Sequence, residues 1–64
     1  MVNINSADAQ TLMTLPGIGE TKAAAILSYR SLHGPFTSLD ELLNVPGIGH
    51  AILDDIRSLI TLGP

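Results

Sequence analysis

The sequence predicts a small all-α domain that contains two copies of one helical unit. The segment Leu15–Gly19 reads Leu-Pro-Gly-Ile-Gly, and it returns thirty residues later as Val45–Gly49, with Val in place of Leu, in a chain of 64 residues. Hydrophobic residues make up 45% of the chain, with one Phe, one Tyr and no Trp. A core of Leu, Ile, Val and Ala is more typical of helices packed on helices than of a sheet. No β-strand is expected, because the short apolar runs lack alternation and are bounded by helix signals.

The first unit is expected over residues 5–33 and should begin with a short helix. Asn5 or Ser6 can cap this helix, because either side chain can accept a hydrogen bond from its first free amides, and it should run to about Met13. Pro16–Gly17 then ends the segment, since proline disfavours helix in the residue before it and glycine tolerates a positive φ.

A longer second helix is predicted over residues 20–33. Apolar side chains recur there with helical spacing, and the stem of Arg30 continues their stripe, which begins with Ala23, Ile26 and Leu27. Gly34 and Pro35 stop the helix and open the linker to the second unit.

The second unit is expected over residues 37–62, and the whole chain should form one domain of four to five short helices. Ser38 followed by Glu41 is typical of a capping box for a third short helix that ends at Asn44. A fourth helix should span residues 50–62, with an inward face formed by Leu53, Ile56 and Ile60.

The repeated Gly-x-Gly turn is the feature of the sequence that suggests binding chemistry. Each turn opens directly into a helix, and so presents unpaired backbone amides at the positive end of the helix dipole. Such amides form a site for an anion, and a nucleic-acid backbone supplies anions at regular spacing. In a single copy, the glycines could serve turn geometry alone, as in an ordinary αα-hairpin. Two copies at equal spacing favour the anion site.

The charge balance differs from that of a strong nucleic-acid binder. Three basic residues oppose six acidic ones, for a formal net charge of −3. The excess of acidic residues lies in residues 33–64, which contain one basic residue, Arg57, and four acidic ones: Asp40, Glu41, Asp54 and Asp55. Because phosphate neutralisation by Lys and Arg supplies most non-specific affinity, we expect any DNA binding to be weak and only mildly dependent on salt.

No pattern in the sequence indicates an enzyme. Neither a Ser-His-acid arrangement nor a cluster of metal ligands is present, and a chain of 64 residues leaves little volume for a pocket. We therefore expect no catalytic residue, no metal, no cofactor and no small-molecule substrate. No apolar run is long enough to cross a bilayer, and the start Met1-Val2 resembles that of a fragment excised from a longer protein.

Two segments, Leu15–Leu27 and Val45–Ile56, resemble the helix-hairpin-helix motif. The shared pattern is hydrophobic-x-Gly-hydrophobic-Gly, followed four positions later by a small or apolar residue, here Ala23 and Leu53. Other segments make the chain similar, over nearly all of its length, to the C-terminal domain of the ComEA family of competence proteins. These segments are Val2–Ala7, Ile26–Arg30, Gly34–Phe36 and Leu39–Leu42.

This resemblance implies a tandem helix-hairpin-helix fold that binds double-stranded DNA without sequence preference. In the family, this binding captures DNA during bacterial natural transformation. The resemblance also implies a place outside the cytoplasmic membrane, in the periplasm or at the cell surface. Tethering would use a segment absent from this chain, and other DNA-uptake proteins would be further partners.

Carried over position by position, the resemblance implies DNA contacts at both hairpins. In the first hairpin, the backbone of Gly17, Ile18 and Gly19 would form a cradle for phosphate. Thr21 would donate a hydrogen bond from its hydroxyl, and Lys22 would make a charge-assisted contact. The residues of the second hairpin are Gly47, Ile48, Gly49 and His50. Ile52 stands where the first copy has Lys22. We predict that the hairpins are related by a pseudo-two-fold axis and that each grips one strand across the minor groove.

The main alternative is a protein-interaction module of the same fold with weak or no DNA binding. In that interpretation, the acidic second half docks a basic partner. The surface around the hairpins discriminates between the two. Uncovered cradles that face one direction favour DNA, whereas an apolar patch over them favours a protein.

Overall fold

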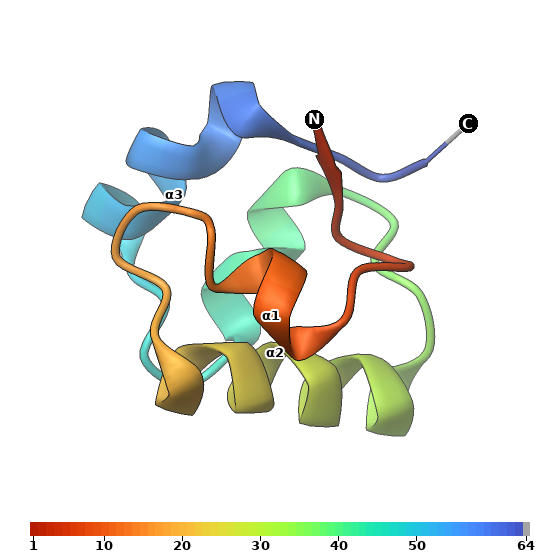
Figure 1. Cartoon of the computed structure of the whole chain (residues 1–64). Coiled ribbons are helices and arrows are strands. Elements are labelled where there is room, and N and C mark those ends of the chain that lie inside the picture. Colours follow the sequence, from red (N-terminus) through yellow and green to blue (C-terminus); the bar gives the residue numbers. More distant parts are fainter. Residues whose placement is uncertain (64) are drawn as a thin grey trace.

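The computed structural model shown in Figure 1 describes residues 1–63 of the protein, which are mostly helical. In chain order the elements are β1 (Val2–Asn3), α1 (Ala9–Leu12), α2 (Glu20–His33), η1 (Leu39–Asn44), α3 (His50–Ile56), η2 (Arg57–Leu59) and β2 (Ile60–Thr61). The elements η1 and η2 are 3-10 helices. In Figure 1, α2 runs along the lower side of the molecule with α1 packed on it, and α3 and η2 lie on the upper side.

Helix α1 is shorter than expected, and the predicted cap by Asn5 or Ser6 is wrong. The N-cap is Asp8, whose Oδ1 accepts a hydrogen bond of 2.8 Å from the amide of Thr11. Asn5 cannot serve as a cap because its side-chain amide bonds to distant backbone, donating to the carbonyls of Phe36 and Leu62. Because these hydrogen bonds hold the N-terminal segment in place, the helix begins only at Ala9.

Helix α2 has the predicted bounds. It buries Ala23 and Ile26, and Gly34, with a φ of 83°, ends it. Arg30 is half-buried, and its Nη1 donates to the carbonyls of Ile4 and Ala7 at 2.8 and 3.0 Å. This guanidinium therefore fixes the N-terminal segment against α2.

The third helix is a 3-10 helix and not the predicted α-helix, and its capping box is also wrong. Ser38 occupies the N-cap position, but its side chain makes no capping hydrogen bond. The carboxylate of Glu41 instead accepts from the amide and hydroxyl of Thr37, at 2.9 and 3.2 Å, and from the hydroxyl of Tyr29 at 3.1 Å. Glu41 thus joins η1 to α2.

The last helical segment ends earlier than predicted, because the chain becomes extended at Ile60. Strand β2 pairs in parallel with β1, with Val2 opposite Ile60 and Asn3 opposite Thr61. The expectation of an all-α fold is therefore corrected to a helical domain with a small two-stranded sheet. Ile60 still points inward, as predicted, and is 2% exposed.

The core is built symmetrically from the two units. Five pairs of buried residues, each pair thirty positions apart, occupy corresponding places: Leu12 and Leu42, Leu15 and Val45, Ile18 and Ile48, Ala23 and Leu53, Ile26 and Ile56. Ile4, Phe36 and Ile60 join them from the segments outside the repeat. Within residues 1–63, no helix combines the length and apolar character needed to span a membrane.

Candidate nucleic-acid interface

The two hairpins contain the same turn. The amide of Ile18 donates to the carbonyl of Leu15 at 3.2 Å, and the amide of Ile48 donates to that of Val45 at 3.1 Å. The third residue of each turn has a positive φ, 78° at Gly17 and 92° at Gly47. Proline at the second position and a positive φ at the third define a type II turn, which favours glycine there. The first glycine of each hairpin is therefore required by the backbone.

The isoleucine between the two glycines anchors each turn. Ile18 and Ile48 are 3% and 4% exposed, and both belong to the core. Their side chains face inward, so they position the turn and do not themselves face a ligand. They can offer a ligand their backbone, as the cradle that the resemblance implies requires, and that contribution stays a prediction.

The second glycine of each hairpin is the N-cap of the helix that follows. Gly19 and Gly49 have extended backbone, with φ of −97° and −109°, and no side chain caps either helix. A Cβ at either position would meet nothing within 4 Å. The first amides of a helix have no partner inside that helix. Because the space beside Gly19 and Gly49 is open, these free amides lie at the surface. They also lie at the positive end of the helix dipole, where an anion is favoured.

Each hairpin lies close to the helix of the other unit, and the two approaches match. A Cβ at Gly17 would lie 3.7 Å from Cγ1 of Ile52, and a Cβ at Gly47 would lie 3.5 Å from Cγ of Lys22. Gly47 corresponds to Gly17, and Ile52 to Lys22, in the thirty-residue repeat. A contact of residue i with j, matched by a contact between their counterparts, is the mark of a two-fold relationship. Figure 1 shows both turns on the left side of the molecule.

This packing brings Lys22 to the second hairpin, which the linear sequence did not predict. Lys22 is half-buried, and its alkyl stem runs beside Gly47. His50, at the start of α3, is exposed beside the same turn. The exposed side chains at the start of α2 are Glu20 and Thr21. The predicted site residues thus gather around the two turns, but the one lysine among them lies over the turn of the other unit.

The remaining two basic side chains have intramolecular partners. Arg57 Nη2 forms a salt bridge of 2.7 Å with Asp40 Oδ1, and this hydrogen bond raises the pKa of the guanidinium. Arg30 donates to backbone carbonyls. Among residues 1–63, Lys22 is therefore the basic side chain left without a salt bridge or hydrogen bond.

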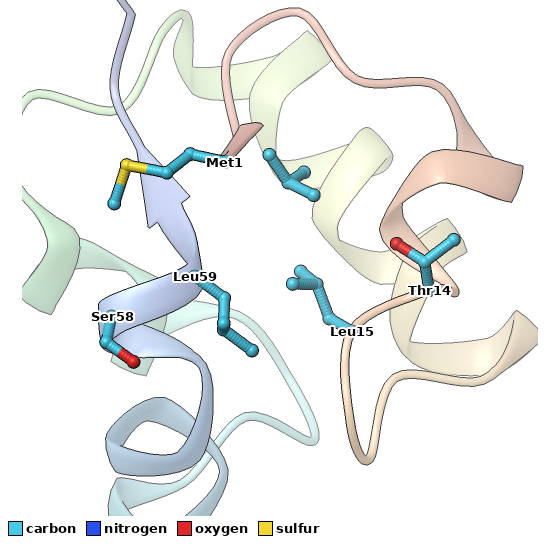
Figure 2. A pocket seen from close by; sticks show the side chains of 6 residues that line it. Met1, Thr14, Leu15, Ser58 and Leu59 are labelled. Carbon is cyan, nitrogen blue, oxygen red and sulfur yellow. The ribbon is translucent and has the colours of Figure 1, made fainter.

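A shallow hollow of about 350 Å³ lies beside the first hairpin. It is lined by Met1, Val2, Thr14, Leu15, Ser58 and Leu59. Figure 2 shows Leu15 and Leu59 facing one another across it, with the hydroxyls of Thr14 and Ser58 at its rim. No ionisable side chain lines this hollow, so it adds neither an acid nor a base to the surface near the hairpins.

Comparison with known proteins extends the resemblance. The model of the helix-hairpin-helix motif family matches residues 1–61. The chain is 39% identical to ComE operon protein 1 of Bacillus subtilis over 62 residues, which are 97% of this chain and 30% of that protein. It is also 47% identical to an uncharacterized protein of Haemophilus influenzae over 60 residues, which are 92% of this chain and 54% of that protein.

A second group of relatives shares only this segment. The chain is 46% identical to endonuclease/exonuclease/phosphatase family domain-containing protein 1 of Rattus norvegicus over 56 residues, which are 88% of this chain and 10% of that protein. The chain thus spans about a tenth of the length of these relatives. The matches point to a non-catalytic segment, and the resemblance to the competence proteins is confirmed. The chain belongs to the helix-hairpin-helix family.

Proposed function

We propose that this domain binds double-stranded DNA without sequence preference, through phosphates held at the two hairpins. The observation that carries the proposal is the reciprocal contact of Gly17 with Ile52 and of Gly47 with Lys22. This contact relates two open, amide-bearing turns by a pseudo-two-fold axis. The two strands of a duplex are related by two-fold axes as well, so each turn can meet a phosphate of one strand across the minor groove.

In this proposal, the domain recognises the sugar-phosphate backbone of DNA and not the bases. Amides and an ammonium group contact phosphate oxygens, which carry no sequence information directly. Among residues 1–63, Lys22 is the Lys or Arg side chain without a salt bridge or hydrogen bond, and Glu20 opposes it in charge. Each neutralised phosphate steepens the logarithmic salt dependence by about 0.9, so we expect a slope of about −1 to −3. A slope as steep as about −6 would contradict this assignment of charges.

The test blocks the amides without disturbing the turn. Gly19→Thr and Gly49→Thr each add a β-branched side chain whose hydroxyl can accept from the free helix amides, in competition with phosphate. Ser38→Thr is the matched control, because Ser38 is also an extended, exposed N-cap residue but precedes η1. Fluorescence anisotropy with labelled duplexes of unrelated sequence should show at least about tenfold weaker binding for both glycine variants and none of this loss for the control. Parent-like binding by both glycine variants would overturn the proposal.

In the cell, this binding would capture DNA during natural transformation, outside the cytoplasmic membrane and beside other DNA-uptake proteins. Similarity to ComE operon protein 1 supports the role in competence, and the location outside the membrane is part of this proposal. The test replaces the matching segment of that Bacillus protein by this chain and measures transformation frequency. The replacement should retain transformation, and adding Gly19→Thr and Gly49→Thr to it should abolish transformation. A replacement that expresses normally but fails with the parent chain would contradict the proposed role.

A protein-interaction module remains the second candidate, because one observation favours it. Asp40, Asp54 and Asp55 are exposed in the second unit, and only Asp40 is paired. If the domain is a protein-interaction module, the parent chain should show no duplex binding at low salt. Charge reversal of Asp54 and Asp55 would weaken association with a basic protein partner.

A further inference from the structure

We propose that Lys22 acts at the second hairpin and not at the first, so that the domain holds the two strands of a duplex unequally. This inference rests on the proposed function. It concerns which hairpin receives the charge, which the order of residues in the chain does not reveal. Lys22 follows the first hairpin in sequence, yet its stem packs on the turn of the second.

The position of the stem fixes where the ammonium lies. A Cβ at Gly47 would be 3.5 Å from Cγ of Lys22 and 3.8 Å from Cε, the carbon that bears the ammonium. Both ends of the aliphatic stem are thus held along the second turn. Among residues 1–63, no carboxylate forms a salt bridge with this lysine. The ammonium is therefore available to a phosphate at that turn.

The first hairpin has an apolar residue in the matching place. Ile52 packs on Gly17 as Lys22 packs on Gly47, and it brings no charge. The first residue of the following helix also differs, since it is Glu20 at the first hairpin and His50 at the second. A phosphate at the second hairpin thus receives a charge-assisted contact, whereas one at the first meets backbone amides beside a carboxylate. Charge-assisted contacts are about twice as strong as neutral ones, so the second hairpin holds its strand more tightly.

The symmetry of the packing makes the inference testable by moving the charge. In the double variant Lys22→Ile with Ile52→Lys, the lysine stem should pack on Gly17 and deliver the ammonium to the first hairpin. Net charge and composition are unchanged, so the salt slope should match that of the parent. What should change is the hairpin to which the lysine is energetically coupled.

The experiment is a pair of double-mutant cycles read by duplex affinity at low salt. In the parent, we measure the loss caused by Lys22→Ala alone, with Gly19→Thr and with Gly49→Thr. The loss should be about tenfold alone and with Gly19→Thr, but less than about threefold with Gly49→Thr, because a blocked second hairpin no longer presents a phosphate to the lysine. In the charge-moved variant, removing the lysine should instead couple to Gly19→Thr. Thermal melts of every variant establish that each is folded.

The outcomes separate this inference from the proposed function. Coupling of Lys22→Ala to Gly19→Thr in the parent, or equal coupling to both glycines, overturns the unequal holding of the two strands while leaving phosphate binding in place. Absence of duplex binding by the folded parent overturns both. The inference is supported if the coupling switches from Gly49 to Gly19 when the lysine is moved. A lysine that attracts DNA only through long-range charge would show no such switch.

Discussion

Asn5 and Phe36 are joined by two hydrogen bonds that imitate the pairing of two strand residues. Nδ2 of Asn5 donates to the carbonyl of Phe36 at 3.0 Å, and the amide of Phe36 donates to Oδ1 of Asn5 at 2.7 Å. The same Nδ2 also donates to the carbonyl of Leu62 at 3.0 Å. One side chain thus links the N-terminal segment, the linker between the units and the C-terminal segment.

We expect Asn5→Asp to destabilise the domain by about 1–3 kcal/mol, because two carbonyls lose their donor and face a carboxylate instead. Urea unfolding at neutral pH measures the effect. Asn44→Asp is the control, since Asn44 is exposed and its amide lies 3.4 Å from the hydroxyl of Tyr29. Equal losses in the two variants would show that Asn5 does not hold the three segments together.

The two glycines of a hairpin should respond oppositely to substitution. Gly47→Ala should cost about 1–2 kcal/mol, because a side chain is strained at a φ of 92°. Gly49→Thr should change stability by less than about 0.5 kcal/mol, since threonine and glycine are similar N-caps. Thermal melts test stability and duplex titrations test binding. Only the second variant should lose binding while keeping its stability, and a marked loss of stability in Gly49→Thr would contradict the open site.

Leu53→Ala should remove a large part of the domain's stability and strongly lower its melting temperature. Leu53 is 0% exposed, and truncating a buried leucine costs about 2–5 kcal/mol. A domain of this length has a total stability of about 3–10 kcal/mol. Leu32→Ala removes the same atoms from a site that is 81% exposed, and it should shift stability by less than about 0.5 kcal/mol. Circular dichroism at 222 nm distinguishes the two, and matching melts would be inconsistent with the core described above.

Stability should fall in acid partly through Glu41. The amide of Thr37, helped by the hydroxyls of Tyr29 and Thr37, lowers the pKa of this carboxyl below its ordinary value. The folded state therefore favours the charged form. Its contribution is complete above the ordinary pKa of about 4.3 and is lost as the pH falls through the lower folded pKa.

Replacing Glu41 by Gln tests this contribution directly. Glu41→Gln should melt below the parent at pH 7, and the difference between the two melting temperatures should shrink as the pH falls below the ordinary pKa of about 4.3. A constant difference between the two curves across this range would show that the carboxylate charge contributes nothing.

The sequence allowed prediction of those elements whose signals are local. The bounds of α2 followed from apolar spacing and from Gly34, and the turns at Gly17 and Gly47 followed from proline before a glycine. Strands β1 and β2 could not be predicted, because two residues are too few to show alternation and each strand exists only through its distant partner. The position of Lys22 over Gly47 depends in the same way on how one unit packs against the other. The repeat implied the symmetry, but only the packed structure shows which hairpin the lysine meets.

The parallel pairing of β1 with β2 gives the domain a particular mechanical character. The strands run in the same direction, so a pull on Val2 toward the N-terminus and on Thr61 toward the C-terminus slides one strand along the other. The hydrogen bond of 2.9 Å from the amide of Ile4 to the carbonyl of Thr61 is then loaded in shear together with its neighbours. Bonds loaded in shear share the force and break together, whereas bonds that are unzipped break one at a time. Tension applied through residues 2 and 61 would therefore load this two-residue pairing directly, before it reaches the hairpins.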